Sequence, residues 1–268
     1  MIINAIKWVF RAQAVGLLLF AALLPAHAAK DRPAVVQIAT IDALLAGSYD
    51  GVMRLDTMLD YGDFGLGTFD RLDGEMLVYQ GEIFQIKADG KAYRPDPALT
   101  TPFATVIRFE PDHRETLKGQ LDFPGLQAVM DALAPQQNHF VALAIEGEFT
   151  RMHVRSVPAQ EKPYPRLAEV AARQPEFHFE NVRGLLVGFR CPAFVRGINV
   201  PGYHLHFIDD GRTVGGHVLD FILTEGEVEW AVADIFTTIL PDPDDVNFQG
   251  LDLTQDLVEE LHRIESPR

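Results

Sequence analysis

The chain has 268 residues, of which 23 are Lys or Arg and 38 are Asp or Glu, so its formal net charge is −15. A phosphate backbone is bound by clustered cationic side chains, so this excess of acids argues against nucleic acid and against an anionic membrane surface as partners. Hydrophobic residues make up 47% of the chain, which is enough for one or two buried cores, and the single cysteine, Cys191, excludes an intramolecular disulfide.

Residues 1–28 have the pattern of a secretory signal peptide. Lys7 and Arg11 precede an apolar run over residues 15–24, and the segment ends in small residues after Pro25. The run is too short to span a bilayer comfortably, although an uncleaved membrane anchor is the alternative. Cleavage removes two cations and no acid, so the mature chain would carry 21 − 38 = −17. The sequence therefore predicts a soluble, periplasmic or secreted protein with no membrane attachment after signal cleavage.

The part of the chain before residue 158 predicts a β-rich fold. Helices are expected at residues 41–46, with Thr40 as N-cap, at 54–59 and at 125–133. Alternating apolar and polar residues predict six strands, at residues 64–69, 75–79, 82–86, 103–109, 140–146 and 149–157.

Residues 158–165 contain three prolines and are the best candidate for a connection between domains. Beyond them, helices are expected at residues 167–173 and 254–264, the second capped and amphipathic. Five further strands are predicted, at residues 176–179, 185–189, 203–207, 217–223 and 227–232. Strands outnumber helices in both parts, which indicates an α+β fold with a high β content.

A short internal similarity links the two parts. The run that begins at Gly74 and Glu75 can be aligned with the run that begins at Gly216 and His217, and each run is followed by a hairpin. Short matches also arise by chance, so duplication and coincidence both stay open. If the match reflects a duplication, Glu75 and His217 occupy equivalent places in two related halves.

Three of the nine histidines form a pattern of their own. His204 and His206 are two residues apart in a predicted strand and project from one face, and a glycine-rich loop returns the chain at His217 in a neighbouring antiparallel strand. Converging imidazoles suit zinc, copper, nickel or iron, and catalytic zinc uses three protein ligands with one position open. The alternative is an accidental histidine-rich strand. Surface or hydrogen-bonded structural roles, without a second histidine nearby, are predicted for His113, His139, His153, His178 and His262.

Three segments resemble the alpha-acetolactate decarboxylase family. They are YGDFGLGTFDRLDGEM at residues 61–76, RSVP at 155–158 and GYHLHFIDDGRTVGGHVLDF at 202–221. The resemblance extends over about residues 37–265. It implies zinc-dependent decarboxylation of (S)-2-acetolactate to (R)-acetoin and carbon dioxide by a homodimer. It assigns the metal to His204, His206 and His217, and catalysis to Glu75, Arg155, Thr68 and an acid of the C-terminal tail, placed at Glu265 with Glu259 and Glu260 nearby.

The family resemblance also gives the expected organisation. We expect two related α/β subdomains with mixed or antiparallel sheets, at residues 37–160 and 166–250, with the zinc site on strands of the second. A C-terminal helix and tail at residues 251–268 would fold back to the active site.

The chemistry of the named side chains agrees with that reaction. A Lewis acid at the ketone oxygen takes up charge when a β-keto acid loses carbon dioxide. Arg155 can pair with the substrate carboxylate, and either Glu75 or Glu265 can supply a proton afterwards. Two other functions stay open at this point. One is a cupin-like metal isomerase or oxygenase, which the acids Asp209 and Asp210 fit poorly. The other is an exported zinc-binding protein without catalysis.

Overall fold

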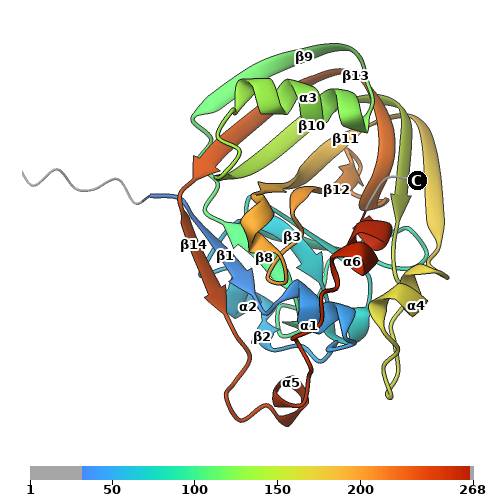
Figure 1. Cartoon of the computed structure of the whole chain (residues 1–268). Helices are drawn as coiled ribbons and strands as arrows, with labels where there is room; N and C mark the ends of the chain where they lie inside the picture. The colour runs from blue at the N-terminus through green and yellow to red at the C-terminus, as the bar shows by residue number, and fades with distance from the viewer. Residues whose placement is uncertain (1–31, 266–268) are drawn as a thin grey trace, which may run out of the picture. The chain divides into compact units, whose positions relative to one another are not determined.

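Two β-sheets form the framework of the computed structural model, which describes residues 32–265 (Figure 1). The seven-stranded sheet has the order β14-β1-β8-β3-β4-β5-β6. Its strands are β1 (Ala34–Ile38), β3 (Phe64–Thr68), β4 (Glu75–Tyr79), β5 (Glu82–Ile86), β6 (Ala92–Tyr93), β8 (Ala104–Ile107) and β14 (Ile235–Ile239). The sheet is mixed, because β1 is parallel to β14 while its other neighbouring pairs are antiparallel.

The second sheet has five antiparallel strands in the order β10-β11-β12-β13-β9. They are β9 (His113–Leu121), β10 (Phe140–Arg155), β11 (Glu176–Cys191), β12 (Gly202–Asp209) and β13 (Gly215–Ala233). Because β10 also pairs with β13, strands β10 to β13 close on themselves. A small ladder joins β2 (Met53–Arg54) to β7 (Thr100–Thr101).

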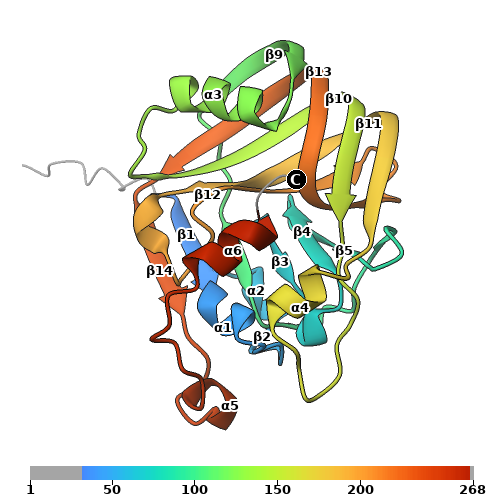
Figure 2. The ribbon, with the colours of Figure 1, turned by 45° about the vertical axis from the view of Figure 1, so that its right-hand side comes forward.

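Helices pack on the five-stranded sheet and at one end of the space between the two sheets. They are α1 (Ile41–Leu45), α2 (Leu55–Met58), α3 (Phe123–Leu133), α4 (Leu167–Ala171), α5 (Val246–Gln249) and α6 (Val258–Glu265), with 3-10 turns at Asp70–Leu72 and Ala193–Val195. Helix α3 packs on the five-stranded sheet, whereas α1, α4 and α6 pack together through one apolar cluster (Figure 2). No helix within residues 32–265 is long and apolar enough to cross a membrane.

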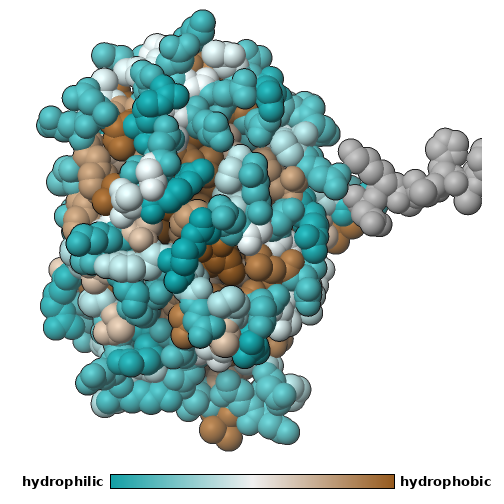
Figure 3. All heavy atoms as spheres, turned by 180° about the vertical axis from the view of Figure 1, so that it is seen from behind, coloured by the Kyte–Doolittle hydropathy of each residue, from teal (hydrophilic) through white to brown (hydrophobic). Residues whose placement is uncertain are grey.

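An apolar layer between the sheets fixes the strands that carry the polar site. Phe64 and Leu66 of β3 belong to one buried cluster with Val187 and Phe189 of β11, and the rings of Phe64 and Phe189 meet edge to face at 5.9 Å. Each large apolar side chain buried in such a layer contributes about 1.5–3 kcal/mol. The layer holds β4 opposite β12. The face shown in Figure 3 is mainly hydrophilic, with a small hydrophobic area near its centre.

Local sequence patterns predicted most of these elements correctly. The structure confirms the strands at residues 75–79 and 82–86 to the residue, and it confirms Thr40 as the N-cap of α1, since the Thr40 hydroxyl accepts a hydrogen bond from the Ala43 amide. The sequence predicted separate strands on either side of residues 147, 184 and 226. These breaks are wrong, because β10, β11 and β13 each run continuously through them. Gly147 pairs with both Gly184 and Gly226, so glycines that resemble turn residues form one row across the sheet.

Strands β1, β9 and β14 were not predicted, and neither were the two-residue strands β2, β6 and β7. In β9 only Leu117 is buried, and the other side chains are exposed or nearly so, which hides the alternation that marks a strand. The β-rich class with mixed sheets and several helices is confirmed.

The two sheets do not follow the expected subdomain boundary. Strands β9 and β10 precede the proline-containing stretch 158–165 but belong to the five-stranded sheet, while β14 follows it and belongs to the seven-stranded sheet. Residues 37–160 and 166–250 therefore each contribute to both sheets. The predicted signal peptide at residues 1–28 lies outside the described residues.

Candidate metal centre and active site

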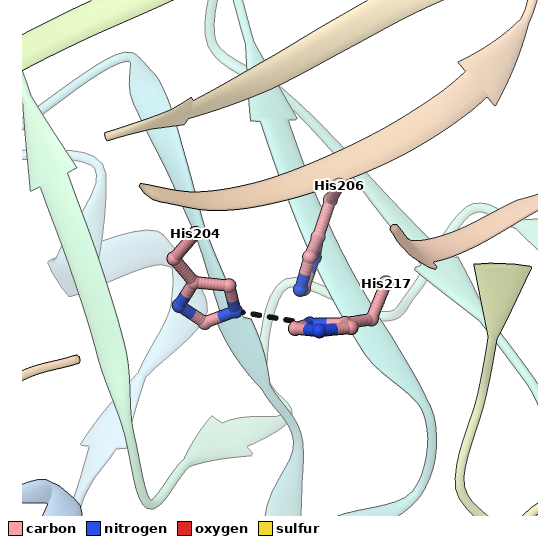
Figure 4. A group of neighbouring side chains, drawn as sticks. All are labelled: His204, His206 and His217. Atoms are coloured by element: carbon pink, nitrogen blue, oxygen red, sulfur yellow. Dashed lines mark hydrogen bonds between the residues drawn. The ribbon is translucent and has the colours of Figure 1, made fainter. Parts of the chain in front are cut away.

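The structure brings His204, His206 and His217 together. His204 and His206 lie on β12, and His206 pairs with His217 of β13 in the antiparallel ladder. All three are buried, with exposed fractions of 7%, 0% and 3%. Their rings face a common space (Figure 4), and one nitrogen from each lies within 4.8 Å of the others. The spacing argument therefore describes the arrangement of these side chains correctly.

Two glycines allow the strands to carry polar side chains into this space. Gly216 has a φ of +151°, and a Cβ there would lie 2.4 Å from the Arg155 carbonyl oxygen. Gly74 has a φ of +93°, and a Cβ there would lie 2.4 Å from the carbonyl oxygen of Ile86. Each glycine directly precedes a residue of the site, Glu75 or His217, so close backbone approach and a left-handed conformation are needed at both places.

The hairpins that carry these glycines also share their register. Thr68 of β3 pairs with Glu75 of β4, just as His206 of β12 pairs with His217 of β13. This equivalence matches the internal similarity in the sequence. It places Glu75 and His217 at corresponding positions of two hairpins, one in each sheet.

A hydrogen bond between the sheets fixes the tautomer of His206. Its Nδ1 lies 2.7 Å from the Met76 carbonyl oxygen on β4, and because a carbonyl can only accept, Nδ1 carries the proton. Nε2 therefore presents a lone pair. Burial, followed by the charge of His204, lowers the pKa of His206 well below its usual value. Burial is also the main cause that lowers the pKa of His217 well below normal and that of His204 to about 3.

The donor atoms of this trio fit a transition metal. Among the described residues, His206 Nε2 and His217 Nε2 are buried without a hydrogen-bond partner, and so is His204 Nδ1, which points away from the other two rings (Figure 4). A buried polar nitrogen without a partner costs roughly 1–3 kcal/mol, which a bound metal would recover. His204 Nε2 lies 3.1 Å from His217 Nδ1, which is the one hydrogen bond within the trio. Neutral imidazole is the form that binds a metal, so burial maintains the protonation state that the site needs.

Two carboxyl groups flank the imidazoles, that of Glu75, which is buried, and that of Glu265, whose side chain is 13% exposed. Glu75 Oε2 lies 3.5 Å from His206 Nε2, while Glu265 Oε2 lies 3.7 Å from His204 Nε2 and 3.6 Å from His217 Nε2. Burial raises the pKa of Glu75 to about 7, with Arg155 opposing the shift and Glu265 adding to it. Burial also raises the pKa of Glu265, against the effect of Arg155. The site thus contains a carboxyl group that can hold a proton near neutral pH.

Arg155, at the end of β10, supplies the positive charge of the site and is only 3% exposed. Its Nη1 donates to Gln174 Oε1 at 2.7 Å, and its Nη2 donates to Glu265 Oε1 at 3.0 Å. Its Nε has no partner among the described residues. The Nε and Nη2 atoms point along one side of the guanidinium, where a carboxylate can accept two parallel hydrogen bonds.

Thr68 lies beside Glu75, and its hydroxyl hydrogen is already donated in a hydrogen bond. Its Oγ1 donates to the Gly74 carbonyl oxygen at 2.7 Å. This bond ties the end of β3 to the turn that precedes Glu75. The hydroxyl oxygen still has an accepting lone pair toward the site.

A cavity of about 40 Å³ lies between these groups. By the usual 10–15 Å³ per water, it has room for about three waters. Its polar lining consists of Thr68, Glu75, Arg155, His204, His217 and Glu265, and its apolar wall of Ile41, Leu44, Leu72, Phe103, Val157 and Leu167. Glu265 also lines a larger pocket of about 440 Å³ beside α6. Glu265, the last residue of α6, therefore lies between the small cavity and the larger pocket.

The structure adds residues that sequence reasoning missed and corrects one expectation. Gln174 and the apolar wall carry no recognisable motif, and only strand pairing and helix packing place them at the site. The expectation that His153 and His178 each lack a neighbouring histidine is wrong. Their ring centroids are 4.0 Å apart, because β10 pairs with β11 in a register that no local pattern reveals.

Comparison with known proteins places this geometry in context. Residues 35–255 match the family model described as alpha-acetolactate decarboxylase. The chain is 47% identical over 229 residues to the alpha-acetolactate decarboxylase of Methanosarcina mazei, covering 85% of this chain and 79% of the relative. It is 44% identical over 232 residues to that of Methylococcus capsulatus, covering 87% and 88%. The crystal structure of the Bacillus subtilis enzyme matches with a TM-score of 0.84 at 36% identity, covering 87% of this chain and 99% of that chain.

Proposed function

The chain belongs to the alpha-acetolactate decarboxylase family, and we propose that it converts 2-acetolactate into acetoin and carbon dioxide with zinc held by His204, His206 and His217. The enzyme class is carbon–carbon lyase, a carboxy-lyase. The observation that carries the metal assignment is the buried, neutral imidazole trio, in which His206 Nε2 and His217 Nε2 have no hydrogen-bond partner and lie 3.5 Å from Glu75 and 3.6 Å from Glu265. The match to the family over residues 35–255 sets aside the cupin-like and the non-catalytic alternatives.

The imidazoles would hold the ion, and the rest of the cavity would hold the substrate. When bound, zinc supplies a Lewis acid that draws electron density from the ketone oxygen of the substrate. The hydrogen bond from His206 to the Met76 carbonyl orients its ring and fixes its tautomer, as such outer partners do in metal sites.

Arg155 is the residue to which we assign the substrate carboxylate. Its Nε is unused, and its Nη2 is occupied by Glu265, so a substrate carboxylate that displaces Glu265 gains a two-point contact on one side of the guanidinium. Gln174 holds the opposite Nη1 and keeps the plane of the guanidinium fixed while that exchange occurs. Positioning of this kind aligns the bond that breaks.

Glu75 is the acid to which we assign the proton that replaces carbon dioxide on the reacting carbon. Before substrate enters, the Arg155 guanidinium donates a hydrogen bond to Glu265, which opposes the rise in its pKa caused by burial, whereas Glu75 makes no such bond among the described residues. Burial raises the pKa of Glu75 to about 7, so the group is both protonated and ionised in quantity near neutral pH. Delivery from one fixed side chain would give a single acetoin enantiomer.

Substrate entry requires a change at α6. The inner cavity of about 40 Å³ is too small for a substrate with nine non-hydrogen atoms, and Glu265 lies between it and the larger pocket. We therefore propose that Glu265 moves away from Arg155 as substrate enters, and that α6 then excludes water from the reacting groups.

Two further parts of the proposal concern the oligomeric state of the enzyme and its export. The family resemblance supports a homodimer, and the pattern of residues 1–28 supports export to the periplasm or the medium with cleavage near residue 28. Light scattering on the purified protein tests the first. Determination of the N-terminal residue of protein isolated from its natural host tests the second.

The reaction is tested with purified mature protein and racemic 2-acetolactate. We expect acetoin and carbon dioxide in equal amounts, consumption of one substrate enantiomer at the catalysed rate, loss of activity on chelation and recovery on addition of zinc. A reaction without enzyme gives the background. Zinc-loaded protein that forms no acetoin above background would overturn the assignment of the reaction. Full activity after complete metal removal would overturn the role of the metal.

A further inference from the structure

A second group of metal-ligating side chains lies outside the imidazole trio. It consists of His153 on β10 with Glu176 and His178 on β11. His153 pairs with His178 across the two strands, and Glu176 is two residues from His178 on the same strand. Alternation along the strands therefore places all three side chains on one face of the sheet.

The three side chains are already close to each other. His153 Nε2 lies 3.0 Å from Glu176 Oε2, and the His153 and His178 rings stack with centroids 4.0 Å apart and planes at 20°. One ligand atom from each residue lies within 4.8 Å of the others. Ligand atoms around a tetrahedral zinc with bonds of about 2.0–2.1 Å are about 3.3 Å apart. Side-chain rotations that move the ligand atoms by about 1 Å would therefore close the site.

The surroundings suit a cation that stays in contact with water. The side chains of His153 and Glu176 are 13% and 29% exposed, and His178 is exposed. Two further acids lie on the strands beside β10. Asp220 of β13 pairs with His153, and Glu180 of β11 pairs with Arg151. Arg151 forms an ion pair with Asp220, and Glu176 is the carboxylate whose oxygen lies within 4.8 Å of a nitrogen of both imidazoles.

We propose that His153, Glu176 and His178 form a second site for a divalent transition metal, with zinc as the ion and a solvent-facing position left for water. Two imidazoles and one carboxylate match the ligand preferences of zinc. A simple His153–Glu176 ion pair would account for two of these residues. It would leave His178 with a ring contact but no hydrogen bond among the described residues.

The proposal is independent of the decarboxylation, and the two can fail separately. His153 lies two residues before Arg155, but it does not line the inner cavity. Loss of the second ion would therefore leave the imidazole trio occupied and acetoin formation intact. The appropriate readout is zinc bound per chain, with activity measured on the same samples.

The experiment titrates holoenzyme with zinc chloride and measures bound zinc per chain after dialysis. We expect two zinc ions in the wild type, one in His178→Ala, and two in His139→Ala, which removes an exposed histidine elsewhere. Direct loss of a ligand should weaken the second site by more than the roughly 10–100-fold that follows loss of an outer partner. His178→Ala should keep the wild-type rate of acetoin formation, which shows that the fold is intact.

Glu176→Gln provides a second test, because the amide preserves the size of the side chain but is a much weaker zinc ligand. It should also bind a single zinc ion. Wild-type protein that binds no more zinc than His178→Ala would overturn the proposal. The same conclusion follows if His178→Ala retains two ions, or if His139→Ala loses the second ion equally.

Discussion

Replacement of Glu75 by glutamine is the sharpest test of the assigned proton donor. Glutamine has nearly the same size and keeps a polar group beside His206, so a side chain that is only 7% exposed should be accommodated without a cavity. The change removes the ability to transfer a proton. Fold and metal content should therefore stay unchanged while the rate falls.

The size of the effect follows from the environment of the carboxyl group. With a pKa of about 7, about half of the Glu75 side chains carry a proton at pH 7, whereas an ordinary glutamate with a pKa of 4.5 would do so in about 0.3% of molecules. A positioned acid contributes about 10²–10⁴-fold to a rate. We expect kcat of Glu75→Gln to fall by that factor, which corresponds to about 2.7–5.4 kcal/mol.

The assay is acetoin formation at saturating 2-acetolactate, with zinc content and thermal unfolding measured on the same preparation. Glu82→Gln is the matched control, because it makes the same chemical change at an exposed position of the neighbouring strand β5. It should behave like the wild type. If Glu75→Gln keeps more than a tenth of the wild-type kcat, Glu75 is not the proton donor.

Three further predictions concern Arg155, Gly216 and Cys191. Arg155→Lys keeps the charge but loses the two-point contact, so kcat/KM should fall about 10–150-fold, and unchanged steady-state kinetics would refute carboxylate binding by Arg155. Gly216→Ala should lower the free energy of unfolding by more than about 2 kcal/mol and reduce bound zinc, because the added Cβ meets the Arg155 carbonyl. Gly81→Ala, with positive φ but open space around the Cβ, should cost only about 1–2 kcal/mol, and equal losses would contradict the clash. Burial raises the pKa of Cys191 to about 12, so thiol reagents at pH 8 should modify it only after unfolding, and rapid modification of native protein would show that it is accessible.

The imidazole trio was predictable because it depends on local geometry. Alternation within β12 places His204 and His206 on one face, and a short glycine-rich return brings His217 beside them. Both features are visible within fourteen residues of sequence. Neither requires knowledge of how distant segments pack.

The rest of the site depends on contacts between segments that are distant in sequence. Glu75 reaches the trio because the two sheets stack, and Glu265 does so because α6 packs against α1 and α4. The resemblance to a known family pointed to both acids, but no period or spacing placed them there. Gln174 had neither a motif nor a family pattern to mark it.

The dependence on contacts between distant segments also explains the errors in the predicted fold. Gly147, Gly184 and Gly226 resemble strand ends when each is viewed in its own segment, yet they pair across the middle of one sheet. His153 and His178 are isolated in the sequence but stack in the structure. Register between long strands is set by the whole core, so a local window cannot contain it.

The central claim is that the imidazole trio holds a zinc ion, and anomalous diffraction at the zinc absorption edge tests it most directly. Crystals of catalytically active, purified protein should show a strong anomalous peak about 2.0–2.1 Å from one nitrogen each of His204, His206 and His217. An active enzyme without a peak at this position, and with the hydrogen bond between His204 and His217 intact, would contradict the account.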